Sequence, residues 1–586
     1  MTSEQVWTSE GGRRWRLPVV DPAAAETLVT ELALPTALAA VLVGRGFDLA
    51  SARAFLAPTT GFATEPEGVL HDPFALHGMA RAVARIERAL AGGEHIRLVT
   101  DYDVDGTTSC LILHGVLDWR MQESGSKATV SYHLPDRFVE GYGLSLRAVE
   151  LAADQGVTLL VTADIGVRDH TSVARARALG MDVIVVDHHL PPGSDVPPDA
   201  HVVLCPPQNA CSYPNKALAA CGVSFKLATA LLAQDPRRDG ILRSLSKLVA
   251  IGTIADVVDL ATPENRALVR LGLEALNAGG HAPGLAALLA VSGALGADGA
   301  KEPITAGTVG WRIGPRINAA GRLEDAAAVV KLLRERDLGR AREQAEALDS
   351  LNRERQSIQD HLFQAALAQL PDPLPSFVVV DGAEAEGWHR GVVGIVAAKL
   401  RERVNRPVAV VARLGEDQAT GSVRSVSGVH AVRALDACAD LFVRYGGHAA
   451  AAGFSLPAER LPALKVRLAA WVDTHHDAAD LAGEERVDVA LAGSAVTLPL
   501  VRSFGLLEPC GKGNEQVRVA LTGRIEGFRV VNEKHLFFRV GGLDAVWWSA
   551  AEHQQRVAGA RVVFGRLDVD RYRGKEQPRV VVEDVA

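Results

Sequence analysis

Long apolar segments are missing from this sequence. Charged residues interrupt each hydrophobic stretch, so no run is long enough to cross a bilayer. The first residues, MTSEQVWTSEGGRRWRLP, lack the apolar core of a secretory leader. These absences predict a cytoplasmic protein that does not associate with a membrane.

Cysteine is also scarce. The 586 residues include six cysteines and no CxxC pair, so neither a disulfide framework nor a structural zinc site is expected. Cys205, Cys211 and Cys221 lie close together in the sequence, and we expect them to be small buried thiols. Unpaired thiols fit a reducing compartment.

An excess of positive charge is missing as well. The chain has 62 Lys and Arg residues against 70 Asp and Glu residues, and its formal net charge is −8. Phosphate binding needs clustered cations, so this total taken alone argues mildly against a nucleic-acid ligand. A local basic groove remains compatible with it, and an acidic site for divalent metals would itself make the total more negative.

The length and the changing pattern of the chain predict several domains, because 586 residues are too many for one hydrophobic core. We expect two α/β lobes joined by a long helix and followed by a small β-barrel. The predicted segments are an N-terminal extension (1–72), a first α/β domain (73–324), a connecting helix (325–372), a second α/β domain (373–484) and the barrel (485–586).

The first α/β domain is predicted from short apolar strands that alternate with helices. This alternation indicates βαβ units and a parallel, doubly wound sheet. The predicted strands are 96–100, 159–162, 183–186 and 202–204, and the predicted helices include 74–93, 106–118 and 173–179.

The later segments have different patterns. Residues 343–370 contain no Gly or Pro and predict one long helix, which is either a rigid spacer or an ordinary surface helix. A second α/β pattern begins with a strand at 377–381, a helix at 392–403 and a strand at 408–411. After residue 485, short β-rich runs separated by Gly turns predict the barrel.

Acidic residues and histidines follow the first three predicted strands. Ligands bind at the carboxyl ends of the strands in a parallel sheet, so we expect these side chains to meet at one edge. They are Asp101, Asp103 and Asp105 after the first strand, Asp164 after the second, and Asp187, His188 and His189 after the third.

So many carboxylates repel one another unless cations lie between them. Carboxylates with one or two imidazoles suit Mn²⁺ or Mg²⁺, and two such ions roughly 4 Å apart can activate water against a phosphodiester. Side chains two apart on a strand point the same way, so Asp103 and Asp105 are each expected to hold one ion. Gly106 then permits a tight turn, and residues 107–109 are expected to cap the next helix.

Simpler explanations exist for each part of this pattern. A single Asp at a strand end is usually a turn or cap residue, and a His pair is usually a surface or core feature. Three strands that all end in acids, one with two histidines, favour the metal site.

Other segments carry weaker signals. Asp256, in GTIADVVDL with Asp259, is not singled out by spacing. The segment WRIGPRINAAGR predicts either a phosphate clamp or a solvated basic helix, and the choice stays open. Its polar residues are Arg312, Arg316, Asn318 and Arg322, and the second α/β domain adds His389, Arg390, Arg424, Ser425 and His448.

These motifs together resemble those of the RecJ family of the DHH phosphoesterase superfamily. The matching segments are DYDVDG, TADIGV, VVDHH, GTIADVVDL, RIGPRINAAGR, GSVRS, RYGGHAAAAGF and LEPCGKGN, which follow the family's order between about residues 100 and 515. The resemblance implies a catalytic DHH domain, a DHH-associated domain and a terminal OB-fold barrel. Residues 1–72 match only loosely.

The resemblance also implies roles for individual residues. Asp164 would bridge two ions, Asp101 would lie in the outer shell or hold a water, and His189 would contact the scissile phosphate. Asp187 completes the expected catalytic set. The implied metal ligands are Asp103, Asp105, Asp164, His188 and Asp256, and the implied contacts to the DNA backbone or 5′ end are Arg137, Arg312, Arg316, Asn318, Arg424, Ser425 and His448.

The activity implied by the resemblance is a 5′→3′ exonuclease that degrades single-stranded DNA to 5′-mononucleotides in DNA repair and recombination. Its implied partners are single-stranded DNA, a single-strand-binding protein and a recombination helicase. The barrel would grip the strand by stacking and charge. Candidate residues are Phe537, Phe538, Trp547, Trp548 and Tyr572, with Arg571, Arg573 and Lys575 nearby, although most of the aromatic residues could instead form the barrel core.

The sequence departs from the family pattern at Ile165, which is not a ligand, and at Cys510 and Glu515. We expect the last two to affect the linker into the barrel rather than catalysis. Two alternatives remain open at this point. One is a DHH phosphodiesterase for short oligonucleotides or cyclic dinucleotides, and the other is an inactive DHH scaffold in a replication complex.

Overall fold

The computed structural model describes residues 5–9, 13–59, 61–63, 69–191, 198–295, 303–477, 481, 484–571 and 575–586. The chain divides into two compact units. The first contains Met1–Ala57, Arg355–Leu507 and Gln516–Ala586, and the second contains Pro58–Glu354 and Glu508–Glu515. Tyr572 and Arg573 lie outside the described residues.

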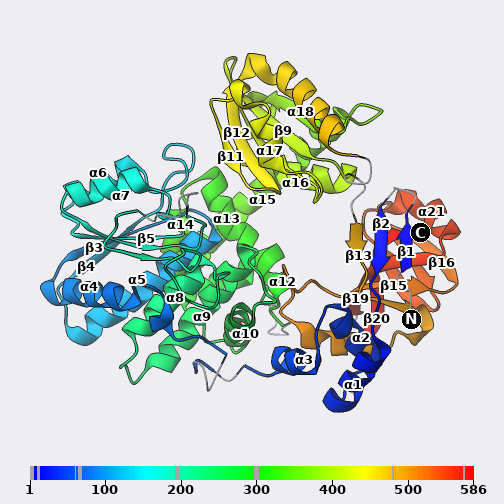
Figure 1. Cartoon of the computed structure of the whole chain (residues 1–586), viewed down its shortest axis with the longest axis horizontal. Helices are drawn as coiled ribbons and strands as arrows, with labels where there is room; N and C mark the ends of the chain where they lie inside the picture. Colours follow the sequence, from blue (N-terminus) through cyan, green and yellow to red (C-terminus); the bar gives the residue numbers. More distant parts are fainter. Residues whose placement is uncertain are drawn as a thin grey trace. The chain divides into compact units, whose positions relative to one another are not determined.

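The second unit contains a five-stranded parallel sheet in the order β4-β3-β5-β6-β7 (Figure 1). The strands are β3 (His95–Thr100), β4 (Thr129–His133), β5 (Leu159–Ala163), β6 (Asp182–Val186) and β7 (Val202–Leu204). The four predicted strands are therefore confirmed. The edge strand β4 was not predicted, because its residues are exposed or partly buried and lack a continuous apolar run.

Helices cover both faces of this sheet because its strands alternate their side chains between two cores. Leu98 and Val161 pack on one face, against α4 (Met79–Gly92), α5 (Val104–Ser124) and α8 (Ala220–Leu231). Val99 and Leu160 pack on the other, against α6 (Leu146–Asp154) and α7 (His170–Ala178).

A helical layer completes the second unit. Val104, Ile251 and Ile317 share one apolar core, which joins the start of α5 to this layer. The helices are α9 (Arg238–Ala255), α10 (Pro263–Asn277), α11 (Pro283–Val291), α12 (Ala306–Thr308), the π-helix η2 (Val309–Ile313), α13 (Gly314–Leu323) and α14 (Ala327–Arg334). The long predicted helix is α15 (Leu338–Ala368), and the division between the units falls within it.

The first unit contains a five-stranded sheet in the order β11-β12-β10-β9-β8, in which only β8 and β9 are parallel. Helix α16 packs on one face, and α17 and α18 pack on the other. The elements are β8 (Val378–Ala383), α16 (Val393–Val404), β9 (Val408–Leu414), β10 (Gln418–Arg424), α17 (Ala431–Asp436), β11 (Arg444–Gly447), β12 (Ala451–Pro457) and α18 (Leu461–His475).

A seven-stranded sheet in the order β14-β15-β19-β20-β18-β17-β16 lies in the same unit. The strands are β14 (Val489–Ala492), β15 (Arg518–Thr522), β16 (Ile525–Val531), β17 (His535–Val540), β18 (Leu543–Trp547), β19 (Val562–Asp570) and β20 (Gln577–Val585), with α20 (Leu498–Phe504) and α21 (Gln554–Gly559) beside them.

The N-terminal residues were predicted to form an extension, but they belong to the first unit and share its core. Leu38 and Val41 pack in the same core as Val519 and Val563 of the seven-stranded sheet. The elements here are β1 (Gln5–Thr8), β2 (Arg14–Leu17), α1 (Pro22–Leu32), α2 (Thr36–Gly44) and α3 (Leu49–Leu56), and β2 pairs with β13 (Glu484–Arg486). The three adjacent cysteines of the sequence analysis are buried free thiols, as predicted.

Candidate metal centre

The first acidic motif runs from the end of β3 into α5. Asp101 follows the strand, and Asp103 is the N-cap of α5, where its Oδ1 accepts a hydrogen bond from the Gly106 amide at 3.1 Å. Asp105 lies in the first turn of the helix, where it accepts hydrogen bonds from the Ala220 and Cys221 amides at 2.7 and 2.8 Å.

This arrangement corrects three predictions. Asp103 and Asp105 do not alternate along a strand, because the strand ends at Thr100 and both residues belong to the start of α5. The cap is Asp103 itself, and the segment 107–109 lies inside the helix, so it does not cap it. Gly106 permits a close approach rather than a turn, because a Cβ there would lie 2.3 Å from the Asp101 carbonyl oxygen.

The second and third motifs follow β5 and β6. Asp164 has a left-handed backbone (φ 63°), and its amide donates to the Val186 carbonyl at 3.0 Å. Asp187 is buried, and its carboxylate accepts hydrogen bonds from the amides of Val167, His188 and His189 at 3.0, 2.7 and 3.1 Å and from His189 Nδ1 at 2.8 Å. Asp187 therefore orients the histidine pair.

Asp256 is the C-cap of α9 and enters the site because that helix packs closely on its neighbours. A Cβ on Gly252 would lie 2.3 Å from Thr108 Oγ1 and 2.6 Å from Cys221 Sγ. The sequence analysis could not derive this placement from spacing, because it depends on helix packing rather than on a strand end.

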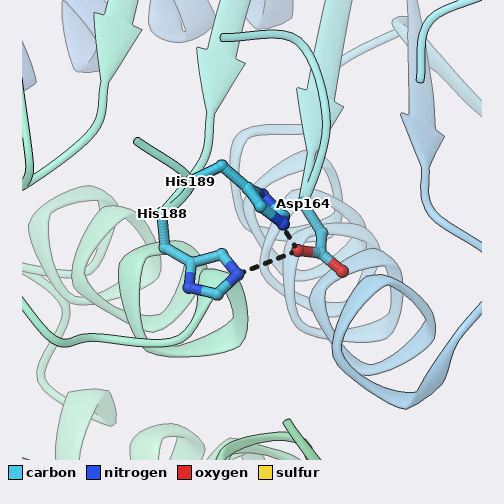
Figure 2. Close-up of side chains that lie close together, drawn as sticks. All are labelled: Asp164, His188 and His189. Carbon is cyan, nitrogen blue, oxygen red and sulfur yellow. Dashed lines mark ion pairs between the residues drawn. The ribbon is translucent and has the colours of Figure 1, made fainter. Parts of the chain in front are cut away.

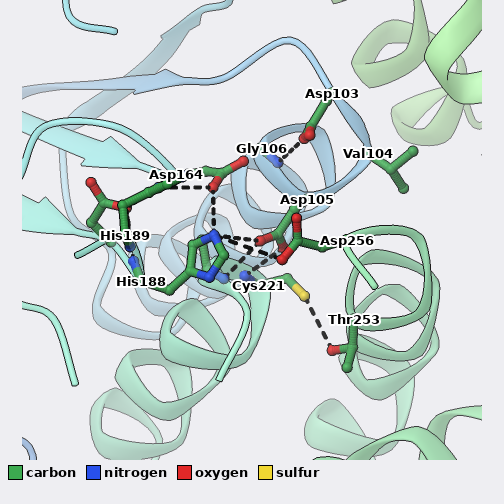
Figure 3. Close-up of polar contacts among 12 residues, drawn as sticks. Asp103, Val104, Asp105, Gly106, Asp164, His188, His189, Cys221, Thr253 and Asp256 are labelled. Carbon is green, nitrogen blue, oxygen red and sulfur yellow. Dashed lines mark hydrogen bonds and ion pairs between the residues drawn. The ribbon is translucent and has the colours of Figure 1, made fainter. Parts of the chain in front are cut away.

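Carboxylates surround the imidazole of His188. Its Nε2 lies 3.2 Å from Asp164 Oδ1, 3.7 Å from Asp256 Oδ2 and 3.9 Å from Asp105 Oδ2 (Figure 3). Both imidazoles face Asp164, with His189 Nδ1 3.8 Å from the same oxygen (Figure 2). Three overlapping groups have ligand atoms within 4.8 Å of one another: Asp101, Asp103 and Asp164; Asp105, His188 and Asp256; and Asp164, His188 and His189.

Asp101, Asp164 and Asp256 resist ionisation. Burial, reinforced by the charge of Asp103, raises the pKa of Asp101 well above its usual value. Burial and the charge of Asp105 raise the pKa of Asp164 well above its usual value and that of Asp256 to about 8. Asp187 differs: burial would raise its pKa, but the hydrogen bond and charge of His189, the charge of His188 and the Val167 amide together lower it to about 2.

These properties fit divalent cations. Burial lowers the pKa of His188, so its ring is neutral at pH 7, and among the described residues its buried Nε2 has no hydrogen-bond partner. A neutral imidazole aimed into a group of buried carboxylates is a donor set suited to Mn²⁺ or Mg²⁺. Bound ions would remove the repulsion that otherwise keeps protons on the carboxylates.

Comparisons with known proteins agree with this site. The DHH family N-terminal domain matches residues 95–253, the DHHA1 domain matches residues 375–474 and the RecJ OB domain matches residues 487–584. The single-stranded-DNA-specific exonuclease RecJ of Bacillus subtilis is 34% identical over 98% of this chain and 71% of its own length. The protein of the same description from Escherichia coli is 34% identical over 87% of this chain and 90% of its own length.

The chain belongs to the RecJ family. Its fold is also that of a solved RecJ structure. The crystal structure of RecJ in complex with Mn²⁺ from Thermus thermophilus superposes with a TM-score of 0.79 at 31% identity, and the match covers 98% of this chain and 79% of that one. A Mg²⁺ complex from the same organism has a TM-score of 0.73 at 29% identity, covering 97% of this chain and 78% of that one.

Arg137 lies beside the metal centre of this RecJ-family chain. Its guanidinium stacks over the Tyr102 ring at 4.5 Å, and its charge favours ionisation of Asp101. Two other predicted phosphate contacts are engaged within the protein. Arg312 Nε donates to the Ser292 carbonyl at 2.9 Å, and Arg316 Nε pairs with Asp349 at 2.8 Å.

Asn318 lies on the same helix, α13, and is half-buried. The helix approaches the first acidic motif closely: a Cβ added to Gly321 would lie only 2.8 Å from the Tyr102 carbonyl oxygen. The segment PRINAAGR therefore belongs beside the DYDVDG motif and is not a free basic helix.

The remaining predicted contacts belong to the other unit of this RecJ-family chain. Arg424 Nη1 donates to Ser422 Oγ at 2.8 Å, and the Ser425 hydroxyl donates to the Val429 carbonyl at 2.6 Å. The Ser425 amide donates to the Ala450 carbonyl at 2.9 Å, which places it next to the turn that carries the exposed His448.

Segment 508–515 belongs to the unit that contains the metal centre. The Leu260 amide donates to the Lys512 carbonyl at 2.8 Å, and a Cβ on Gly513 would lie 2.0 Å from Asp259 Oδ1. The charge of Lys512 favours ionisation of Asp256. This motif is therefore more than a linker into the barrel, since it contacts the loop that follows Asp256; that the departures at Cys510 and Glu515 do not affect catalysis stays a prediction.

Among the described residues of this RecJ-family chain, no helix has the length and apolar character needed to span a membrane.

Proposed function

We propose that the protein is a metal-dependent exonuclease that degrades single-stranded DNA from the 5′ end to 5′-mononucleotides. The observation that carries this proposal is the cluster around His188 Nε2, with oxygens of Asp164, Asp256 and Asp105 within 3.9 Å. Membership in the RecJ family supports the substrate, because the curated relatives are described as single-stranded-DNA-specific exonucleases.

Five residues would hold two divalent ions. The family resemblance implies that Asp164 is the ligand shared by both, and its carboxylate and the His188 imidazole each belong to two of the ligand groups. The proposed ligands are Asp103, Asp105, Asp164, His188 and Asp256. When bound, the ions would supply an activated water and charge stabilisation at the phosphodiester.

The residues around the ligands would orient the substrate. Asp187 fixes the His189 ring through Nδ1, and the ring would contact the phosphate or the leaving 3′ oxygen. The Asp187 contact raises the pKa of His189, although burial opposes it, and this supports a ring that carries a proton for the leaving group. Asp101 would act from the outer shell.

Cations and aromatic rings would hold the DNA strand. Arg137 would contact phosphate beside the metal centre, and Arg312, Arg316, Asn318, Arg424, Ser425 and His448 would contact the backbone or the 5′ end. Phe537 and Trp548 form an aromatic patch on the OB domain, with ring centroids 6.0 Å apart and Arg529 5.2 Å above Phe537. Bases can stack on such a patch. Phe538 is excluded, because it is 3% exposed and lies in the core.

We further propose that the protein works in the cytoplasm in DNA repair and recombination. A single-strand-binding protein and a recombination helicase are the protein partners implied by the family resemblance. Affinity capture from cells with DNA removed by nuclease treatment would test these partners separately from DNA binding.

The deciding experiment is digestion of single-stranded oligonucleotides that carry a label at the 5′ or the 3′ end, with Mn²⁺ or with EDTA. We expect early release of the 5′ label as mononucleotide, gradual shortening of the 3′-labelled strand, and no degradation of blunt duplex. Asp164→Asn is the matched inactive control.

Other outcomes favour the alternatives. Release of the 3′ label first would contradict the polarity. Cleavage restricted to short oligonucleotides, with no degradation of long single strands, would support the oligonucleotide phosphodiesterase. No cleavage at all with Mn²⁺ would support an inactive scaffold.

A further inference from the structure

Tyr142 reaches into the metal centre from the loop between β4 and α6, and no role for it followed from the sequence. Its hydroxyl donates to the Asp164 carbonyl at 3.2 Å. The same oxygen lies 3.1 Å from His189 Nε2 and 3.3 Å from His189 Nδ1, and the two rings meet edge to face with centroids 5.8 Å apart.

The loop holds Tyr142 from both sides. On one side, Glu140 accepts hydrogen bonds from His133 Nε2 at 3.1 Å and from the Ser145 hydroxyl at 2.7 Å. On the other side, the Leu144 amide donates to Asp169 Oδ2 at 2.7 Å. Gly143 has a positive φ of 97°, and a Cβ there would lie 2.7 Å from Asp169 Oδ1, so the backbone next to Tyr142 has little freedom.

The hydroxyl has only one proton, and it donates this proton in the hydrogen bond to the Asp164 carbonyl. The Tyr142 oxygen can therefore only accept from the His189 ring. The hydroxyl makes these contacts although the residue as a whole is 53% exposed. Asp187 holds the ring at Nδ1, and the Tyr142 oxygen is a second contact, nearest to Nε2.

We propose that Tyr142 is a positioning residue that fixes the orientation of the His189 imidazole for phosphodiester cleavage. The hydroxyl is anchored on the Asp164 peptide, which itself has a left-handed backbone, so the tyrosine ties the histidine to the segment that carries the proposed bridging ligand. This inference rests on the proposed nuclease function.

The kinetic test compares Tyr142→Phe with Tyr142→Leu on a single-stranded oligonucleotide at saturating Mn²⁺. Loss of the hydroxyl should lower kcat about fivefold with little change in KM, as deletion of one hydrogen bond does. Tyr142→Leu should have the same effect on kcat as Tyr142→Phe. A Phe variant with wild-type kcat and a Leu variant with raised KM would overturn the proposal and make the exposed ring a stacking surface for a base.

A double-mutant cycle asks whether Tyr142 acts through the histidine. In a His189→Ala background, Tyr142→Phe should cost nothing further, because the ring that it positions is gone. Equal fold-losses in both backgrounds would contradict this role. A melting temperature unchanged by Tyr142→Phe is expected, and a large decrease would instead assign the hydroxyl a structural role.

A third readout does not depend on nuclease activity. The imidazole ¹⁵N resonances of His189, assigned by comparison with His189→Ala, should shift in Tyr142→Phe, even if the wild-type protein cleaves no DNA. Unchanged His189 resonances would refute the positioning role alone, whereas absence of wild-type cleavage would refute only the proposed function.

Discussion

At the scale of single residues, the metal centre combines carboxylates that the fold itself does not neutralise. Asp187 is satisfied by four donors, but Asp164 and Asp256 face other acids and a neutral imidazole. The contacts of Asp187 form a complete hydrogen-bond network. Asp164 and Asp256 lack opposite charges, which bound cations would supply.

Asp164→Asn should abolish catalysis while the fold survives. Asparagine tolerates the left-handed backbone at this position, but it removes the charge shared by two ligand groups. We expect a rate loss greater than about 100-fold at saturating Mn²⁺, because even changes to residues that only hydrogen-bond the metal ligands cost about 10- to 100-fold. Asp154→Asn, at an exposed position on α6, is the control and should keep full activity. A variant Asp164→Asn with more than about half the wild-type rate would contradict the assignment.

The metal-free protein should lose stability as pH rises from 7 to 8.5. Asp256 has a raised folded pKa of about 8, so its contribution to stability is present below its unfolded pKa and disappears as pH passes about 8. The raised pKa values of Asp101 and Asp164 act in the same direction. Thermal melting in EDTA should show the decrease, and saturating Mn²⁺ should remove it.

The control for this effect is Asp256→Asn, which should melt with a weaker dependence on pH in EDTA because one titrating carboxylate is absent. Asp187 does not contribute in this range, since its pKa is about 2. The same pH dependence in both proteins would show that the cluster does not titrate as described.

At the scale of elements, the strand ends were predictable and the helix contacts were not. Parallel strands bring their carboxyl ends together by geometry, so Asp101, Asp164 and His188 could be grouped from the sequence alone. Asp256 and Tyr142 reach the site through packing of α9 and through an irregular loop, and neither follows a periodic pattern. The family resemblance implied Asp256, whereas Tyr142 is recognised only in the folded structure.

Gly106 should be essential for the close contact between α5 and the Asp101 peptide. Gly106→Ala places a Cβ 2.3 Å from a backbone oxygen, so the start of the helix must shift and displace Asp103 and Asp105. We expect weaker Mn²⁺ binding by calorimetry and a stability loss of about 1–3 kcal/mol.

Gly115→Ala tests the same substitution in the same helix without the clash. Its Cβ would lie 3.5 Å from Leu245 Cδ2, which is ordinary contact. This variant should bind Mn²⁺ normally and should be as stable as the wild-type protein or slightly more stable. Equal behaviour of the two variants would disprove the importance of the close approach.

At the scale of the whole molecule, chain order and structural units differ. Segment 508–515 lies between α20 and β15 of the first unit in sequence, yet it packs in the second unit beside Asp259. The N-terminal helices share a core with the C-terminal sheet. Composition and periodicity identified the types of these segments but could not identify their partners, because such contacts join residues hundreds of positions apart.

The aromatic patch of Phe537 and Trp548 should contribute to binding of the strand. Trp548→Ala should raise the Kd for single-stranded DNA about fivefold or more, measured by fluorescence anisotropy in EDTA so that no cleavage occurs. Phe74→Ala removes a similarly exposed aromatic residue from the other unit and should leave the Kd unchanged. Equal Kd values for Trp548→Ala and the wild-type protein would exclude the patch from DNA binding.

Diffraction from crystals soaked in Mn²⁺, recorded at the manganese absorption edge, tests the metal centre most directly. We expect anomalous peaks bounded by Asp103, Asp105, Asp164, His188 and Asp256, and their loss in Asp164→Asn. Manganese located elsewhere, with none in contact with Asp164 or His188, would contradict the account.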